Sequence, residues 1–443
     1  MGNLVTPEKI QKLRRALYAK AKGEPEFRFY RLYDKIHRED ILDYAYACCR
    51  SNNGAPGADG VTFEDVEAYG RGKWLGELAS ELREKTYKPG AIRRVYIPKP
   101  NGKQRPLGIP NLKDRVCQTA GMIVLEPIFE ADLPPEQYAY RSGKNALEAV
   151  KQVHSLLNQG HLEVVDADLS GYFDTIPHAE LMKSVARRIV DKHILRLIKM
   201  WLEAPVEEED GDGRWKRTTR NKDDRLGIPQ GSPISPLLAN LYMRRFIAGW
   251  KKFGYEEQFG AKIVNYADDL VICCRKGKAE TAMSKLRRMM TLLKLTVNEE
   301  KTRICRVPEE SFDFLGYTFG RLHSYRRRKS YIGSKPSKKS VKQIIETIRI
   351  QTEHKKFWME AGEMVRAINR KLKGWANYFK LGAVGKPYRQ IDRYVLNRLC
   401  RWVCGKHKEK SRAVKRYPYE SFYDIWGLIK LSKIPQTFPW AKA

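Results

Sequence analysis

Apolar residues recur with a helical period towards both ends of the chain. Windows with this period, each of which predicts a helix, lie at residues 7–20, 39–50, 62–84, 338–349, 364–379 and 388–403. Thr6, placed before Pro7, is the expected N-cap of the first helix. Residues 52–60 are dominated by Asn, Gly and Pro and predict a loop. We therefore expect helical regions on both sides of a centre of a different kind.

That centre mixes strand and helix periods. Strands are predicted at residues 92–98, 162–169 and 263–274, and helices at 114–127, 145–157 and 181–201. Residues 99–105 contain Pro, Asn and Gly among basic residues and predict a hairpin turn. The acidic stretch 207–213 lacks the order of a calcium-binding loop, so we interpret it as a solvated hairpin tip. Together these patterns indicate an α+β fold.

The net charge of the chain indicates what kind of molecule it binds. The 443 residues include 84 Lys and Arg against 52 Asp and Glu, a formal net charge of +32, of which +23 falls in residues 321–443. A folded, strongly basic chain is typical of a protein that binds nucleic acid. No apolar run is long enough to span a bilayer, and the eight cysteines form no paired CxxC units. We expect a cytoplasmic protein without membrane contact and without zinc.

Three carboxylates lie where strands end. Asp168 closes the strand at 162–169, and Asp268 with Asp269 interrupts the apolar strand at 263–274. Adjacent carboxylates repel each other, so they require a compensating cation unless the turn is simply solvated. Oxygen ligands without nearby His or Cys favour Mg²⁺, and two such ions catalyse nucleotidyl transfer in polymerases. The neighbouring motifs favour the metal over the solvated turn.

One of these motifs lies between the acidic strands, at residues 227–240. Gly227 and Gly231 permit a close approach of the backbone, and Ser235 with Pro236 is expected to cap the helix that follows. Such a loop suits contact with a nucleotide. An ordinary entry into a helix is the alternative, and this segment does not separate the two.

The order of these motifs resembles the group II intron-encoded reverse transcriptase/maturase family, of the bacterial type that lacks the endonuclease domain. The segments that carry the resemblance are residues 105–110 (RPLGIP), 138–143 (YAYRSG), 164–174, 227–240, 266–269 (YADD), 314–317 (FLGY) and 374–379 (GWANYF). Only a short tail follows Val403 and no endonuclease-type cysteine set is present, so strand cleavage is not expected. Each segment alone is weak evidence for this family, whereas the occurrence of all of them in this order is specific to it.

The resemblance implies a right-hand polymerase with fingers, a palm made of an antiparallel sheet with helices, and a helical thumb. The implied divisions are an N-terminal helical extension with a template lid (1–85), fingers and palm (86–330), a basic thumb or maturase domain X (331–420) and a C-terminal tail (421–443). The implied metal ligands are Asp168, Asp268, Asp269 and the Leu169 carbonyl, and the implied nucleotide-binding residues are Lys99, Arg105, Arg141, Phe173, Gln230 and Lys301. Among these, Phe173 would be the ring that excludes a 2′-hydroxyl, with Tyr172 as the alternative.

The predicted function is RNA-directed DNA polymerisation with two Mg²⁺ ions, together with an RNA-binding maturase role in intron splicing. The expected partners are an RNA template, the RNA/DNA duplex, deoxynucleoside triphosphates and structured intron RNA. Three alternatives remain open: a domesticated reverse transcriptase in antiviral defence or DNA repair, a splicing factor that uses the polymerase fold as a scaffold, and an RNA-directed RNA polymerase, which Phe173 disfavours.

Overall fold

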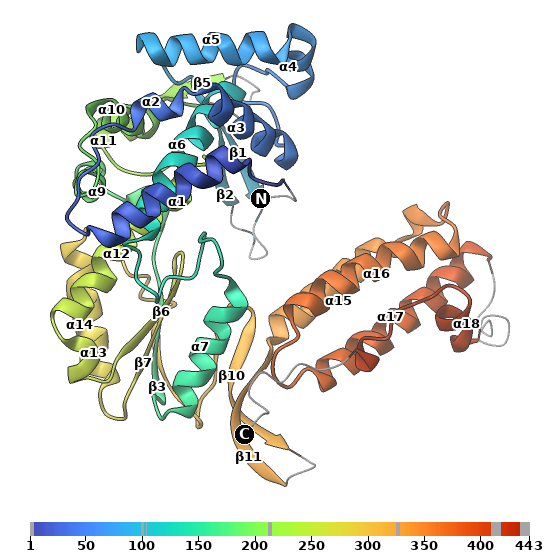
Figure 1. Ribbon diagram of the computed structural model, residues 1–443. Helices are drawn as coiled ribbons and strands as arrows, with labels where there is room; N and C mark the ends of the chain where they lie inside the picture. Colours follow the sequence, from blue (N-terminus) through green and yellow to red (C-terminus); the bar gives the residue numbers. More distant parts are fainter. Residues whose placement is uncertain are drawn as a thin grey trace.

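The structure is a computed structural model that describes residues 4–98, 102, 104–210, 215–324, 328–408 and 418–434. It contains an N-terminal group of helices, three sheets and a C-terminal helical bundle that lies beside the sheets (Figure 1). We call the sheets, in the order in which they begin along the chain, the outer sheet, the central sheet and the C-terminal sheet.

The N-terminal helices pack against one another and against helix α6 (Leu112–Glu130), which follows the hairpin of the outer sheet. They are α1 (Glu8–Gly23), α2 (Tyr33–Ile36), α3 (Glu39–Asn52), α4 (Phe63–Tyr69) and α5 (Arg71–Glu84). The expected cap at Thr6 is wrong, because Pro7 is the N-cap and its extended backbone places Thr6 outside the helix. The Thr6 hydroxyl instead lies 2.8 Å from the hydroxyl of Tyr44 on α3.

The outer sheet has the strand order β2-β1-β4-β5. Its strands are β1 (Ile92–Pro98), β2 (Gln104–Ile109), β4 (Val206–Glu209) and β5 (Trp215–Thr218). The hairpin of β1 and β2 was expected, and Pro98 pairs with Gln104 at its tip. β4 and β5 form an antiparallel hairpin, as predicted, but residues 207–209 lie in β4 between β1 and β5, so the tip begins only after Glu209; residues 211–213 lie outside the described residues.

The central sheet has the order β6-β7-β3-β8 and is antiparallel throughout. Its strands are β3 (Glu163–Asp168), β6 (Lys262–Tyr266), β7 (Asp269–Cys274) and β8 (Arg303–Arg306). Successive side chains enter different cores: Val164 packs with helix α7 (Ala146–Asn158), and Val165 packs with helices α12 (Ser235–Lys252) and α14 (Ala279–Leu292). Both faces are therefore buried, which is why these strands are almost continuously apolar.

Further helices surround this sheet. They are α6 (Leu112–Glu130), α8 (Tyr172–Thr175), α9 (His178–Ala186), α10 (Lys192–Leu202), α11 (Arg220–Asp224) and α13 (Tyr255–Gln258). The single helix predicted over 181–201 is wrong, since α9 and α10 are separate. Residue 189 forms a bridge to Phe29, and Asp191 caps α10 by accepting bonds from the backbone N–H groups of His193 and Ile194.

The chain then forms the C-terminal sheet and the bundle. The sheet, which the patterns did not predict, contains β9 (Phe312–Phe314), β10 (Tyr317–Ser324) and β11 (Lys329–Pro336). The bundle contains α15 (Lys338–Gln351), η1 (His354–Lys356), α16 (Ala361–Tyr378), α17 (Gly385–Lys406), α18 (Tyr419–Asp424) and η2 (Leu431–Lys433), so its three predicted helices are present. Residue 330, at the predicted domain boundary, lies within β11. In the described part of the chain, no helix is long and apolar enough to cross a membrane.

Candidate functional site

The three predicted aspartates meet at one end of the central sheet. Asp168 is the last residue of β3 and is the register partner of Asp269, the first residue of β7. Asp268 lies in the two-residue turn between β6 and β7, next to Ala267, whose φ is +57°. A short hairpin turn of this kind requires a positive φ, which alanine adopts only under strain. The turn therefore brings two carboxylates of one hairpin beside the carboxylate of the neighbouring strand.

A buried amide holds this turn in place. The Asn265 side chain is 1% exposed and donates hydrogen bonds to the carbonyls of Ala267 (2.8 Å) and Asp269 (3.3 Å). Because both carbonyls belong to the turn or its first flanking residue, the Asn265 side chain fixes the backbone of the turn. Its role was missed in the sequence, where an Asn three residues before an acidic pair gives no distinct signal.

The carboxylates destabilise one another's charged forms. Desolvation by the surrounding protein, followed by repulsion from Asp268 and Asp168, raises the pKa of Asp269 to about 7. Desolvation also raises the pKa of Asp166, two residues before Asp168, to about 6, although Arg303 opposes that shift. This end of the sheet is thus a site where added positive charge is favourable.

One cation is already supplied by the chain. The Lys301 ammonium lies 2.8 Å from Oδ2 of Asp168, and the Asn298 amide donates to the same oxygen at 3.1 Å. The hydrogen bond to Asp168 raises the pKa of Lys301, while its side chain stays 60% exposed. The structure therefore brings Lys301 to the aspartates, and Asn298 is a further neighbour that sequence reasoning missed.

The donor set fits a hard divalent cation. All three side chains offer carboxylate oxygens, and the Leu169 carbonyl is a fourth candidate. The bridge between Leu169 and Val297 uses the Asp168 carbonyl and the Ser170 N–H, so the Leu169 carbonyl takes no part in it and faces the β7 side. Within the described ranges, no three acidic, His or Cys side chains are already arranged to hold an ion. The Lys301 ammonium, 2.8 Å from Asp168, already compensates part of the charge of this carboxylate.

A chain of hydrogen bonds connects the outer sheet to helix α8, which follows β3 of the central sheet. Arg105 on β2 donates from Nε to the Gln230 side chain at 3.0 Å, and Gln230 donates to Asp174 at 3.1 Å. Gly231 has a φ of +115°, and an added Cβ there would clash with the Gly108 carbonyl, so only glycine permits this approach. The structure thus joins the two expected nucleotide-binding residues Arg105 and Gln230, whereas Lys99 lies outside the described residues.

The loop that carries Gln230 enters helix α12 differently from the expectation. The predicted cap at Ser235 is wrong, because the helix begins at Ser235 and Ile234 is its N-cap. The Ser235 hydroxyl donates to the Pro229 carbonyl at 2.8 Å and closes the loop on itself.

Phe173 and Tyr172 are both buried. Their side chains lie edge to face, and the Tyr172 hydroxyl donates to the Ala239 carbonyl at 2.6 Å. Phe173 is 7% exposed and belongs to the main core. Its role as the ring that excludes a 2′-hydroxyl stays a prediction, and the engaged hydroxyl of Tyr172 makes that residue the poorer alternative.

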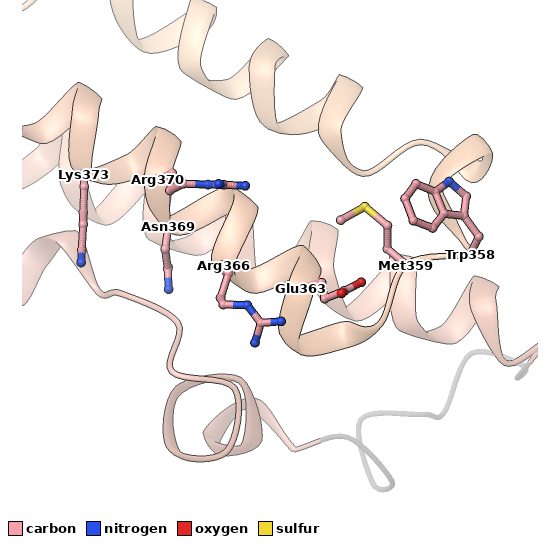
Figure 2. Close-up of a pocket in the computed structure, with 7 residues that line it drawn as sticks. All are labelled: Trp358, Met359, Glu363, Arg366, Asn369, Arg370 and Lys373. Carbon is pink, nitrogen blue, oxygen red and sulfur yellow. The ribbon is translucent and has the colours of Figure 1, made fainter. Parts of the chain in front are cut away.

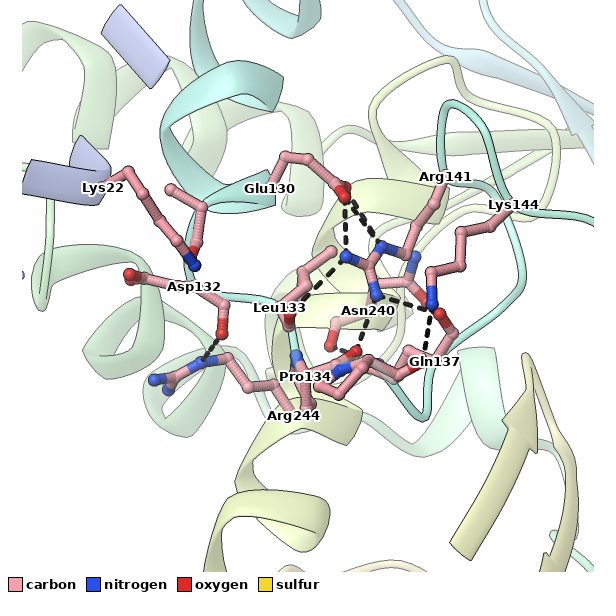
Figure 3. Close-up of polar contacts among 12 residues, drawn as sticks. Lys22, Glu130, Asp132, Leu133, Pro134, Gln137, Arg141, Lys144, Asn240 and Arg244 are labelled. Carbon is pink, nitrogen blue, oxygen red and sulfur yellow. Dashed lines mark hydrogen bonds and ion pairs between the residues drawn. The ribbon is translucent and has the colours of Figure 1, made fainter. Parts of the chain in front are cut away.

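Arg141 is not brought to the aspartates. Its side chain is 6% exposed, and its guanidinium holds Glu130 at 2.6 Å while donating to the carbonyls of Pro134 (2.6 Å) and Gln137 (2.9 Å) (Figure 3). These bonds occupy the donors that a phosphate would need. The geometry favours a role in closing the loop before Arg141 over the predicted contact with substrate.

The C-terminal bundle presents a separate basic groove of about 590 Å³ on helix α16. Arg366, Arg370 and Lys373 follow each other along the helix, and the loop before α16 places the indole of Trp358 at the end of the groove (Figure 2). Trp358 is 76% exposed, and no carboxylate of the described residues forms an ion pair with the three cations. Exposed aromatic and basic groups together suit single-stranded or irregular RNA.

Two family profiles match the chain. Residues 97–319 match reverse transcriptase (RNA-dependent DNA polymerase), and residues 341–419 match the maturase-specific domain of group II introns.

Protein YkfC of Escherichia coli (strain K12) is 32% identical over 367 residues, which cover 75% of this chain and 93% of the relative. Group II intron-encoded protein LtrA of Lactococcus lactis subsp. cremoris is 26% identical over 467 residues, which cover 86% and 75%. A solved partial Cas6-RT-Cas1–Cas2 complex has a TM-score of 0.35 at 23% identity, covering 59% of this chain and 42% of that one.

Proposed function

Because this chain belongs to the reverse transcriptase family, we propose that Asp168, Asp268 and Asp269 are the metal-binding carboxylates of its polymerase site. The family assignment makes the chain an RNA-directed DNA polymerase with a maturase role, and the outer sheet, central sheet and C-terminal bundle are the fingers, palm and thumb of a right-hand fold. The observation that carries the proposal is the register pair of Asp168 and Asp269 beside the turn that holds Asp268. The predicted domain boundaries stay predictions, as does a cytoplasmic location.

The family generally uses divalent metal ions, and we propose Mg²⁺ held by the three carboxylates and the Leu169 carbonyl. When bound, two such ions would supply an activated primer 3′-hydroxyl and neutralise charge on the leaving pyrophosphate. The repulsion that raises the pKa of Asp269 is the unfavourable energy that bound cations would relieve.

The neighbouring polar residues are suited to hold a triphosphate. Arg105 offers a planar pair of donors for phosphate oxygens, and Lys301 offers a point charge that can move from Asp168 to a phosphate. We place Gln230 against the nucleotide, because it already orients Arg105 and lies at the glycine approach. On the basis of the family resemblance, we propose that Lys99 contacts the triphosphate and that Phe173 contacts the sugar.

The affinity for Mg²⁺ should depend on pH below neutrality. Since the pKa of Asp269 is raised to about 7, this carboxylate is protonated below that pH and must lose its proton to bind a cation. We expect the association constant to fall about tenfold for each pH unit below 7 and to level off above it. Calorimetric titration with Mg²⁺ in buffers of different ionisation enthalpy would count the released proton.

The matched variant for this titration is Asp269→Asn. It should bind Mg²⁺ more weakly and lose the pH dependence between pH 5.5 and 7, because the titrating carboxyl is gone. Parent binding that stays constant over this range would contradict the assignment of Asp269 as a ligand.

We further propose that the groove on α16 binds structured RNA, with an RNA template, its DNA product and deoxynucleoside triphosphates as the other partners. Changing Arg366, Arg370 and Lys373 to Gln removes three cations that no described carboxylate pairs with. Binding of RNA releases counterions, at roughly 0.7 to 0.9 per phosphate contacted, so the slope of log K against log salt should flatten by about two.

Filter binding to a group II intron RNA at several salt concentrations would measure this slope. The control variant changes Lys276, Lys278 and Arg288, three exposed cations near or on α14 on the palm, to Gln. A slope that falls equally in both triple variants would show only an effect of net charge and would remove the groove from the proposal.

A further inference from the structure

The loop of residues 133–141 runs along the edge of the palm sheet and joins it through one bridge. Gln137 bridges Asn265 of β6 in parallel, through bonds from the Asn265 N–H to the Glu136 carbonyl (2.9 Å) and from the Tyr138 N–H to the Asn265 carbonyl (3.0 Å). Asn265 lies three residues before Asp268. A parallel course from this bridge carries the chain from Gln137 towards the same end of the sheet as the aspartates, and the residue reached after three steps is Tyr140.

Buried polar side chains make this edge rigid. Arg141 closes the segment through Glu130 and two carbonyls, and Asn240 on α12 donates to the Ala139 carbonyl at 2.8 Å (Figure 3). The Gln137 side chain returns a bond to the Asn240 carbonyl at 3.0 Å. The residues on either side of Tyr140, Ala139 and Arg141, are therefore anchored to α12 and α6, and Gln137 is anchored to the palm sheet.

Tyr140 itself is held outward from this rigid segment. Ala139 is 1% exposed and the Arg141 side chain 6%, whereas Tyr140 is 51% exposed. Its φ is +56°, a left-handed backbone conformation that a bulky aromatic residue seldom adopts. Strain of this kind persists where surrounding structure enforces it, and it is concentrated at functional sites.

The surroundings of its ring are those of the active site. The Tyr140 hydroxyl has no hydrogen-bond partner among the residues that the structure describes. Partial burial, followed by the negative charge of Asp268, raises the pKa of Tyr140, while the positive charge of Arg105 opposes the shift. The Tyr140 phenol, which the bridge of Gln137 to Asn265 brings towards the aspartate end of the sheet, is therefore within electrostatic range of Asp268 and of Arg105.

The strand order separates Tyr140 from the side where the triphosphate is expected. Lys301 joins Asp168 on β3, next to β8, whereas the segment of Tyr140 lies beyond β6, at the other edge of the sheet. The aspartates lie between them. A nucleotide whose phosphates lie near Lys301 would extend its sugar and base across the aspartates towards the β6 edge, together with the end of the primer–template duplex.

We infer that Tyr140 is a substrate-contacting residue whose ring packs against the nascent base pair and whose hydroxyl donates to its sugar–phosphate backbone. This inference rests on the proposed active site and adds a residue to it. A fixed aromatic surface suits any base, since every base offers an apolar face. Tyr140 would hold the terminal pair in line with the aspartates and thereby discriminate a paired from a mispaired primer end.

Single-nucleotide incorporation on an RNA template tests this contact. Tyr140→Ala should lower kcat/KM for the correct nucleotide by about 10- to 100-fold, the range that corresponds to loss of one base–aromatic contact. Tyr140→Phe, which removes only the hydroxyl, should lower it by about 3- to 10-fold. The ratio of extension from a matched over a mismatched primer end should fall in the Ala variant, and a merely structural role would not change that ratio.

The controls separate this inference from the active-site proposal. Tyr18→Ala removes another exposed ring, 41% exposed on α1, and should retain parent kinetics. Should the Ala variant melt below the parent, Tyr140→Asn replaces it, because Asn tolerates a positive φ. A folded Ala or Asn variant within twofold of the parent, with an unchanged matched-to-mismatched ratio, would overturn the contact while leaving a working polymerase. An inactive parent would instead overturn the proposed site itself.

Discussion

Replacing Asp268 by Asn is expected to lower the rate of primer extension more than a thousandfold. Asn keeps the size of the side chain and removes the charge, so the turn between β6 and β7 should persist while the metal loses a ligand. A thousandfold loss corresponds to about 4 kcal/mol of transition-state stabilisation. Affinity for RNA should stay within about twofold, since the basic groove on α16 lies on a different domain.

The matched control is Glu300→Gln, which removes an exposed carboxylate beside Lys301 without touching the register pair of Asp168 and Asp269. It should extend primers like the parent. Extension by Asp268→Asn at more than a tenth of the parent rate would show that Asp268 is not a metal ligand, and the chain would then need another centre for its chemistry.

Arg141→Ala should destabilise the protein by about 3 to 5 kcal/mol. The change leaves Glu130 without its ion-pair partner. It also removes the donors that bind the carbonyls of Pro134 (2.6 Å) and Gln137 (2.9 Å). The Glu130 side chain is 25% exposed and keeps part of its hydration, so most of the cost comes from the two carbonyls, which lose bonds to a charged donor worth about 1.5 to 3 kcal/mol each. Arg141→Lys should lose less, since one ammonium replaces part of the planar set of donors. Chemical denaturation measures both free energies of unfolding.

The same variants decide between the two roles of Arg141. If it closes the loop, the folded Lys variant should retain the parent KM for nucleotides, whereas a phosphate contact would raise that KM without changing stability. The control is Lys144→Ala, a half-buried cation three residues away whose ammonium donates to the Pro135 carbonyl at 2.7 Å and lies 4.6 Å from the centre of the Tyr138 ring. Its loss should cost less than about 1 kcal/mol.

The carboxylate site was predictable because its signals are local. Asp168 ends a strand that is recognisable from its own apolar residues. Asp268 and Asp269 interrupt a second apolar run. The hairpin of β1 and β2 is likewise encoded by adjacent residues, whereas the place of Arg105 at the site was implied by the family resemblance and agrees with its bond to Gln230. Strand and turn preferences act over a few residues, and a short window of sequence contains them.

Long-range contacts decided the rest. The helical period continues from residue 181 to residue 201, yet the buried Arg188 donates to the carbonyls of Ala21, Glu24, Pro25 and Phe27, and this contact separates α9 from α10. The residues 181–201 alone do not indicate that Arg188 will bind carbonyls more than 150 positions away in the sequence.

The same reason explains Arg141 and Tyr140. Both stand in residues 138–143, and the family resemblance implied a nucleotide contact for Arg141 and none for Tyr140. Whether a guanidinium faces phosphate or Glu130 depends on the path of the backbone through Gln137 and Asn265, which is set by pairing with β6. Residue type thus determined which chemistry this protein contains, whereas the tertiary structure decided which side chains reach the site, because burial and partners are properties of the folded chain.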